Sequence, residues 1–175
     1  MKSKKKYAIL FSILAIIMAT TIILSLPSKD EKFAQKFITE FYSLSEYDLS
    51  TYLTKETPEN INTVKKYEDY FTYDAYAKLS KNLHFDEYNE MAYLNKCTLD
   101  VKDVDITTNS DVVVSDVSSF KYTITIDVNY SDLDKNEEIT QSGTINVVNK
   151  DNLYYVSDLT IIDITQEPIF IGKID

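Results

Sequence analysis

The segment Phe120–Tyr130 has the sequence FKYTITIDVNY, in which large apolar side chains alternate with polar ones. Successive side chains of a β-strand point to opposite faces, so this alternation predicts a strand with one buried and one solvated face. Strands of that kind are typical of antiparallel sheets that are covered on one side. The segment therefore predicts a domain built on an antiparallel sheet.

The same alternation continues on both sides of this strand. An earlier strand is expected over Tyr93–Ile106, with a β-bulge near Lys102–Asp103, where the alternation changes phase. Two later strands are expected over Glu138–Val148 and Leu153–Asp163, joined by the turn formers Asn149–Asn152. The inward positions that the alternation assigns carry Phe, Tyr, Ile, Val, Leu and Cys, so we expect an apolar interior.

The residues before the sheet have helical periodicity. Ser28 and Glu31 have the spacing of a capping box, with a hydroxyl at the N-cap and a carboxylate three residues later. A second helical region is expected over Glu59–Asn82, with a break near Thr72–Asp74. Helices followed by antiparallel strands predict an α+β domain in which N-terminal helices pack on one face of a curved sheet. The apolar face of the first helix comprises Phe33, Phe37, Phe41 and Leu44.

The N-terminal residues have the pattern of a membrane anchor. A basic tail, residues 1–7, precedes an uncharged apolar run from Ala8 to Leu26. A helix of these 19 residues rises roughly 28 Å, close to the roughly 30 Å of a bilayer's hydrocarbon core. Lysines before the run favour a cytoplasmic N-terminus. We expect a single-pass protein of the cell membrane that contacts the bilayer through residues 8–26 as one transmembrane helix.

A cleaved signal peptide is the alternative interpretation of these residues. The apolar run is longer than the usual stretch of about 7–15 residues, and no A-x-A-like cleavage site follows it. With either interpretation, the remainder of the chain lies outside the cytoplasm. It consists of an extracytoplasmic α+β domain over residues 28–164 and a C-terminal tail over residues 165–175.

The composition excludes several functional classes. The chain has 28 acidic and 18 basic residues, for a net charge of −10, and all of its acidic residues follow the apolar run. Such a surface repels phosphate backbones, which argues against binding nucleic acid. The only glycines are Gly143 and Gly172. Glycine-rich phosphate loops and dinucleotide fingerprints are therefore excluded, and we expect no cofactor.

Side chains suited to catalysis or metal binding are few. Cys97, the only cysteine, falls on a buried strand position and is interpreted as inert packing. His84, the only histidine, lies with Asp86 in a polar connector and is interpreted as part of a solvated loop. Residues Asp132–Glu138 have the early spacing of a calcium loop, but Glu137 stands where glycine is required, which favours a polar turn. We expect no catalytic residue, no metal site and no enzyme.

Two groups of residues are candidate contacts with a partner or a ligand. The tyrosines of the second helical region recur every three residues, which favours a helix–sheet interface with hydroxyls at its rim over a ligand pocket. An apolar group follows Pro168 in the C-terminal tail, as an edge strand or a docking segment. The candidate residues are Tyr67, Tyr70, Tyr73, Tyr76, Ile169, Phe170 and Ile171.

Three segments resemble the nuclear transport factor 2-like (cystatin-like) superfamily. They are an opening helix over Phe33–Tyr42, a later helix over Tyr70–Leu79 and a closing strand over Leu153–Leu159. The resemblance implies a cone in which a helical layer packs in the concavity of a bent antiparallel sheet. The chain departs from the pattern at Tyr154 and Tyr155, where many members have tryptophan.

One membrane helix followed by one such domain resembles the single-pass scaffolds of type IV secretion and conjugation machines. This implies a non-catalytic protein that contacts other membrane or channel proteins, or itself. The alternative is a surface sensor or binding module with an aromatic-lined pocket for a small apolar ligand or peptide. The many Lys, Ile, Asn and Tyr residues, without arginine, are typical of a Gram-positive source.

Overall fold

The computed structural model describes residues 27–45, 64–79, 92, 95–110, 114, 116–130 and 136–164. The expected basic tail at 1–7, anchor at 8–26 and C-terminal tail at 165–175 lie outside these residues. Within the described ranges, no helix has both the length and the apolar character needed to span a bilayer.

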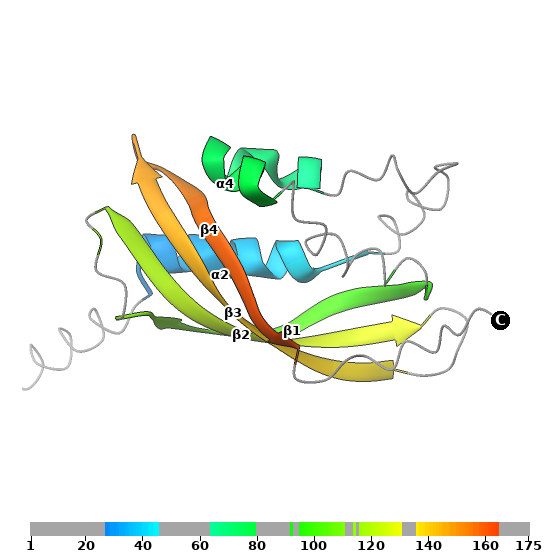
Figure 1. The fold of residues 1–175 in the computed structure, drawn as a ribbon. Coiled ribbons are helices and arrows are strands. Elements are labelled where there is room, and N and C mark those ends of the chain that lie inside the picture. Colours follow the sequence, from blue (N-terminus) through cyan, green and yellow to red (C-terminus); the bar gives the residue numbers. More distant parts are fainter. Residues whose placement is uncertain are drawn as a thin grey trace, which may run out of the picture.

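The sheet is an antiparallel meander of four strands in the order β1-β2-β3-β4 (Figure 1). All four strands were predicted, and the alternating segment lies in the inner strand β2. The earliest strand begins at Cys97, later than the predicted Tyr93, because Asn95 and Lys96 form a turn. The strands are β1 (Cys97–Thr108), β2 (Val117–Tyr130), β3 (Asn136–Lys150) and β4 (Leu153–Ile164).

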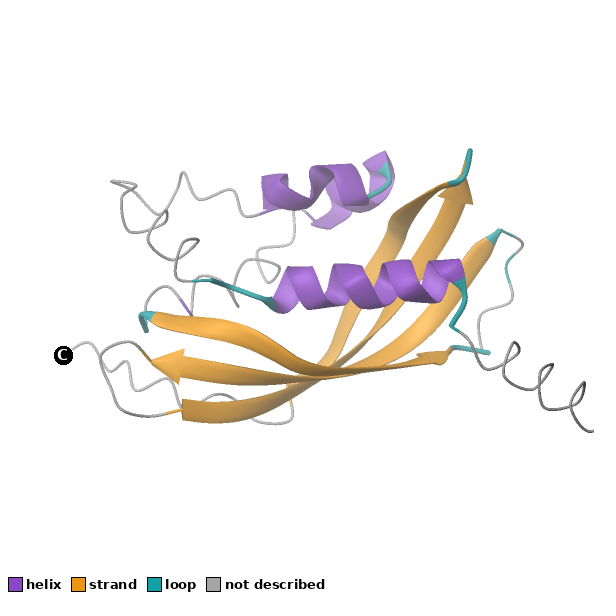
Figure 2. Ribbon diagram, turned by 180° about the vertical axis from the view of Figure 1, so that it is seen from behind, coloured by secondary structure: helices purple, strands orange, loops and turns teal. Residues whose placement is uncertain are grey.

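The sheet is strongly curved (Figure 2), and its register irregularities lie in the edge strands β1 and β4. The predicted bulge in β1 is confirmed, since the register with β2 shifts between Val101 and Asp103. Strand β4 shifts its register with β3 twice, beside Gly143 and beside Val147. An extra residue in one strand bends it and increases its twist. These three shifts therefore allow the sheet to wrap around the helix on its concave face.

Helix α2 (Lys29–Tyr42) lies in the concave face and contacts all four strands (Figures 1 and 2). It begins at the predicted capping box: Ser28 Oγ accepts from the Glu31 amide at 3.2 Å, and the Glu31 carboxylate accepts from the Ser28 amide at 3.4 Å. After the helix ends, Leu44 exchanges two backbone hydrogen bonds, of 2.9 and 3.0 Å, with Leu99 at the edge of β1. The buried residues of α2 are Ala34, Phe37, Ile38, Phe41 and Tyr42.

The second helical region is divided into two pieces, as predicted. They are a 3-10 helix, η2 (Val64–Tyr70), and α4 (Tyr73–Leu79). Between them the backbone runs along the edge of β4, where the Thr72 amide donates to the Val156 carbonyl at 2.9 Å. Thr72 Oγ1 then accepts from the Ala75 amide at 3.3 Å at the start of α4. The predicted arrangement of helices against one face of a curved antiparallel sheet is thereby confirmed.

Candidate functional site

Few of the described polar side chains are buried in the domain. In the described part of the chain, the buried polar side chains are Asn109, Ser119 and Gln141, all uncharged. Gln141 is 0% exposed on the inner face of β3, where only apolar residues were predicted. The alternation of β3 places Gln141 between the inward Ile139 and Gly143, so the sequence did contain this signal. A glutamine amide neither gains nor loses a proton to become charged at neutral pH, so it supplies no general acid or base.

Two tyrosine hydroxyls meet in the middle of the concave face. The Oη atoms of Tyr42 on α2 and Tyr122 on β2 lie 2.8 Å apart, and both side chains are buried. Burial raises the pKa of Tyr122 well above its ordinary value, and the hydrogen bond with Tyr42 offsets only part of that effect. The hydroxyl therefore stays protonated at neutral pH. The pair fastens α2 to the sheet.

Gly143 makes room for this tyrosine. It lies opposite Tyr122 across the β2–β3 pair. A Cβ atom at position 143 would lie 2.3 Å from Tyr122 Oη, 2.4 Å from Tyr122 Cζ and 2.3 Å from the Thr160 carbonyl oxygen. The missing side chain lets the ring lie close against β3 at the point where β4 also shifts its register.

The buried thiol of Cys97 packs in the core, as predicted. Cys97 is 0% exposed and free, and its Sγ donates to the Ala92 carbonyl at 3.5 Å. Burial raises the pKa of the thiol to about 11, so the reactive thiolate is scarce at neutral pH.

The predicted polar turn and the lone histidine fall largely outside the described residues. His84 and Asp86 lie in an undescribed range, as do residues 131–135. In β3, Glu137 Oε2 accepts from Tyr130 Oη at 3.0 Å. Nowhere in the described ranges do three or more His, Cys, Asp or Glu side chains gather in a way that could hold a metal ion.

The four tyrosines of the second helical region do not share one face. Tyr67 is buried, and its hydroxyl donates to the Glu40 carbonyl at 3.0 Å. Tyr70 is half-buried, and its hydroxyl donates to the Glu40 carboxylate at 2.6 Å, a bond that raises the pKa of Tyr70. The first two tyrosines therefore join η2 to α2, while η2 and α4 also pack against β4 of the sheet.

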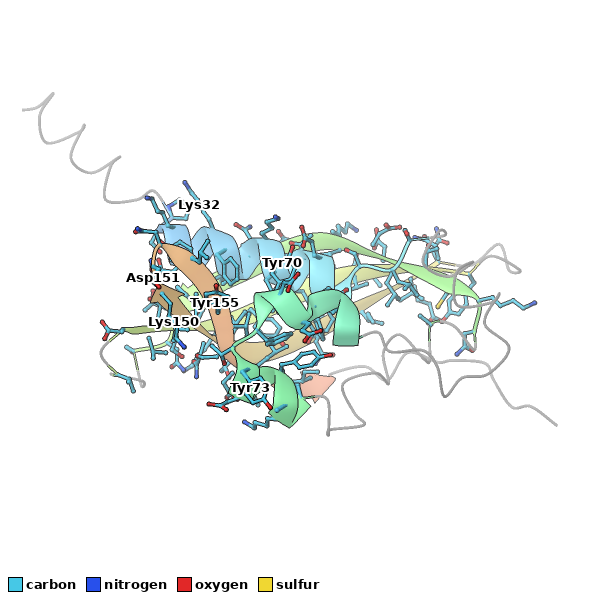
Figure 3. All side chains as sticks on the ribbon, turned by 90° about the horizontal axis from the view of Figure 1, so that it is seen from above. Lys32, Tyr70, Tyr73, Lys150, Asp151 and Tyr155 are labelled. Atoms are coloured by element: carbon cyan, nitrogen blue, oxygen red, sulfur yellow. The ribbon has the colours of Figure 1, made fainter. Side chains whose placement is uncertain are left out.

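The other two tyrosines belong to α4. Tyr73 is 85% exposed and lies farther from α2 than Tyr70 (Figure 3). Tyr76 is half-buried against the core. Ile169, Phe170 and Ile171 lie outside the described residues. The assignment of all seven residues as partner or ligand contacts stays a prediction.

Aromatic rings from α2, η2 and β4 pack against one another. The ring centroid of Phe37 lies 5.3 Å from that of Phe71 and 5.6 Å from that of Tyr70. Phe33 extends the cluster to Tyr154, at 5.9 Å. Each such pair contributes about 0.5–1.5 kcal/mol beyond its buried area. An aromatic-lined pocket was the alternative that the sequence left open. In the described residues, these aromatic rings pack against each other.

The outer face of the sheet is polar and acidic along most of its length. Asp127 lies opposite Asp100 on one side and opposite Glu138 on the other. Lys102 Nζ lies 2.7 Å from Glu138 Oε2 and 3.7 Å from Asp127 Oδ1, and the bond to Glu138 is the largest of the effects that raise the pKa of Lys102. Asn129 Nδ2 donates to Asp100 Oδ2 at 2.9 Å. The lysine at the β1 bulge therefore offsets repulsion between neighbouring carboxylates.

The outer face becomes apolar at one end of the sheet. Val117, Val148 and Tyr155 lie opposite one another across β2, β3 and β4, and Val114 bridges Val117. Leu153 shares the face of Tyr155, two residues away on the same strand. Val114 is 56% and Leu153 59% exposed. These five residues, named the apolar end row from here on, were not identified from the sequence.

Comparisons with known proteins show a likeness in fold. No protein-family model and no curated protein matches the chain. The crystal structure of CagV, a VirB8 homolog of the type IV secretion system of Helicobacter pylori strain 26695, superposes with a TM-score of 0.54 at 14% identity, covering 76% of this chain and 98% of CagV. The solution structure of the putative transfer protein TraH from the Gram-positive conjugative plasmid pIP501 covers 80% of this chain and 99% of TraH, with a TM-score of 0.40 at 15% identity. The described domain therefore shares its fold with CagV.

Proposed function

We propose that the protein is a membrane-anchored, non-catalytic component of a conjugation or type IV secretion apparatus. Its extracytoplasmic domain would bind other proteins of that apparatus, or a second copy of itself. The observation that carries this proposal is the fold shared with a VirB8 homolog, which extends over 98% of that chain.

The interior of the domain supports a role without catalysis. Its described buried polar groups are amides and hydroxyls, and its one thiol has a raised pKa of about 11. Carboxylates are found on the outer face, where Asp127 and Glu138 pair with Lys102, and at the helix ends. General acid–base catalysis needs a titratable group held in a protected site, and these surface carboxylates do not meet that requirement.

The proposed topology follows from the N-terminal sequence. Residues 8–26 would cross the bilayer with residues 1–7 in the cytoplasm, and the domain at 28–164 would lie outside, followed by the tail at 165–175. The length of the apolar run supports a crossing of the bilayer. The lysines before the run support the orientation with a cytoplasmic N-terminus.

Photo-crosslinking in intact cells tests the proposal. A photoreactive amino acid replaces Tyr73, which is 85% exposed, or Phe170 in the tail. We expect crosslinked products containing channel components in cells that carry the apparatus. Cells that produce this protein without the other components are the matched control, in which only products of self-association should remain. Finding monomer alone at both positions in both strains would contradict the scaffold role.

A further inference from the structure

We propose that the apolar end row rests on the outer surface of the lipid bilayer, so that the domain touches the membrane at a second place beside its anchor. This inference depends on the proposed function, because it takes residues 8–26 as the anchor. The row would contact the uncharged boundary between the lipid headgroups and the acyl chains.

The first step is that the row lies at the end of the domain where α2 begins. Asp30, in the first turn of α2, accepts a hydrogen bond from Ser118 Oγ at the start of β2. Ser118 is the neighbour of Val117 in the row. Lys32 of α2 and Lys150 and Tyr155 of the β3–β4 hairpin lie at the same end of the molecule (Figure 3). The helix start and the row are therefore close together.

The second step is the short connection between this end and the proposed anchor. Only Pro27 and Ser28 separate Leu26, the last residue of the apolar run, from Lys29, the first residue of α2. Two extended residues span at most about 7 Å. The headgroup layer of one leaflet is about 5–8 Å thick. An anchored chain therefore holds the start of α2 in or just above the headgroups, and the end of the sheet with it.

The third step is the chemistry of the row compared with the rest of the outer face. Val114 and Leu153 are more than half exposed, and Tyr155 joins them with a ring and a hydroxyl. Tyrosine is favoured at membrane interfaces, where one end of its side chain is apolar and the other is hydrated. The adjoining row inward is polar, with Ser119 opposite Asn146. Apolar side chains on the outer face thus gather at the end that the anchor would bring to the lipid.

The charges at this end indicate that the contact is apolar. Exposed Lys29, Lys32 and Lys150 are accompanied by exposed Asp116 and Asp151. These charges of opposite sign leave little net attraction for anionic lipid, so the contact should form equally on zwitterionic membranes. A second protein copy fits the row less well, because five side chains are far fewer than the roughly 20–30 residues per partner of a standard interface.

Tryptophan fluorescence tests the proposal, since the chain has no tryptophan of its own. The full chain is reconstituted into phosphatidylcholine vesicles as Leu153→Trp, with lipids brominated on the upper acyl chain as quenchers. Thr125→Trp is the matched control, on the same outer face but eight residues beyond Val117 along β2, or roughly 26 Å away. Flotation after carbonate extraction is measured on each sample, and the Tyr155→Trp variant repeats the test with an aromatic-for-aromatic exchange.

We expect all variants to float. The bromolipids should quench the emission of Leu153→Trp and Tyr155→Trp at least about twofold. The emission of Thr125→Trp should change by less than about a tenth, because interfacial side chains reach only about 5–10 Å into the lipid. Flotation with equal, weak quenching at all three positions would overturn the lipid contact and leave the anchor standing. Emission that shifts with the protein-to-lipid ratio but is not quenched would assign the row to a second copy. Quenching that occurs only with anionic lipid would overturn the proposal that the contact between the row and the membrane is apolar. Failure to float would overturn the anchor and the contact together.

Discussion

Replacing Gly143 with alanine should strongly destabilise the domain. The new Cβ would lie 2.3 Å from both Tyr122 Oη and the Thr160 carbonyl oxygen. Overpacking a core costs about 1–3 kcal/mol, and the upper value applies here because one of the two atoms is strand backbone. Moving the ring also threatens the 2.8 Å bond between Tyr122 and Tyr42. A buried hydroxyl left without a partner adds about 1–3 kcal/mol. We expect a total loss of about 4–6 kcal/mol, against about 5–15 kcal/mol for a whole domain.

Urea unfolding of the detergent-solubilised protein, followed by the near-ultraviolet circular dichroism of its tyrosines, measures this loss. Thr144→Ala is the matched control: it changes the next residue of β3, on the outer face, and should alter stability by less than about 1 kcal/mol. Adding Tyr122→Phe to Gly143→Ala removes the contact with Oη but leaves the contacts with the ring carbon Cζ, at 2.4 Å, and with the Thr160 carbonyl oxygen, at 2.3 Å. The double variant should therefore remain destabilised. Full recovery in the double variant, or Gly143→Ala within about 0.5 kcal/mol of the wild type, would refute the reasoning.

Three further predictions concern stability and reactivity. Cys97 should resist alkylation at neutral pH in the folded protein and react once urea exposes it, because the thiol is fully buried with a pKa of about 11. Rapid labelling of the native protein would contradict this. Ser28→Ala removes one half of the capping box and should cost about 1 kcal/mol in urea unfolding, with no change expected in the denaturant slope. Partial burial raises the pKa of Asp30, but hydrogen bonds from Ser118, Ser28 and backbone amides outweigh it and hold the pKa below the ordinary value of 3.8. The charged carboxylate therefore contributes stability above about pH 4, and this stability is lost as the pH falls through the lowered native pKa. Asp30→Asn should flatten this dependence of the unfolding free energy on acid pH. An unchanged pH profile would show that the bond to Ser118 carries no energy.

The elements that depend on local pattern were predictable from the sequence. Strict alternation over Phe120–Tyr130 identified β2, and the spacing of Ser28 and Glu31 identified the start of α2. The change of phase near Lys102 identified the bulge of β1. Each of these signals lies within a few residues, where side-chain direction follows directly from backbone geometry.

Features that depend on distant pairing were missed. The apolar end row requires the cross-strand register of β2, β3 and β4, and the bulges of β4 hide that register from simple counting. The separation of the four tyrosines into two groups could not be foreseen for a related reason. A 3-10 helix repeats every three residues, so Tyr67 and Tyr70 share one face. The backbone then leaves the helix at Phe71 to bridge β4, and Tyr73 begins a separate helix with a new direction.

The way α2 is attached to the sheet bears on how the domain would carry mechanical load. The helix is fastened near its start by the bond between Ser118 and Asp30, and just past its end by the two backbone bonds between Leu44 and Leu99. These attachments are roughly 20 Å apart, the length of a 14-residue helix. Between them, the bond between Tyr42 and Tyr122 also holds the helix to the sheet. A force applied at the first turn of α2 would therefore have to break attachments at both ends of the helix to detach it from the sheet.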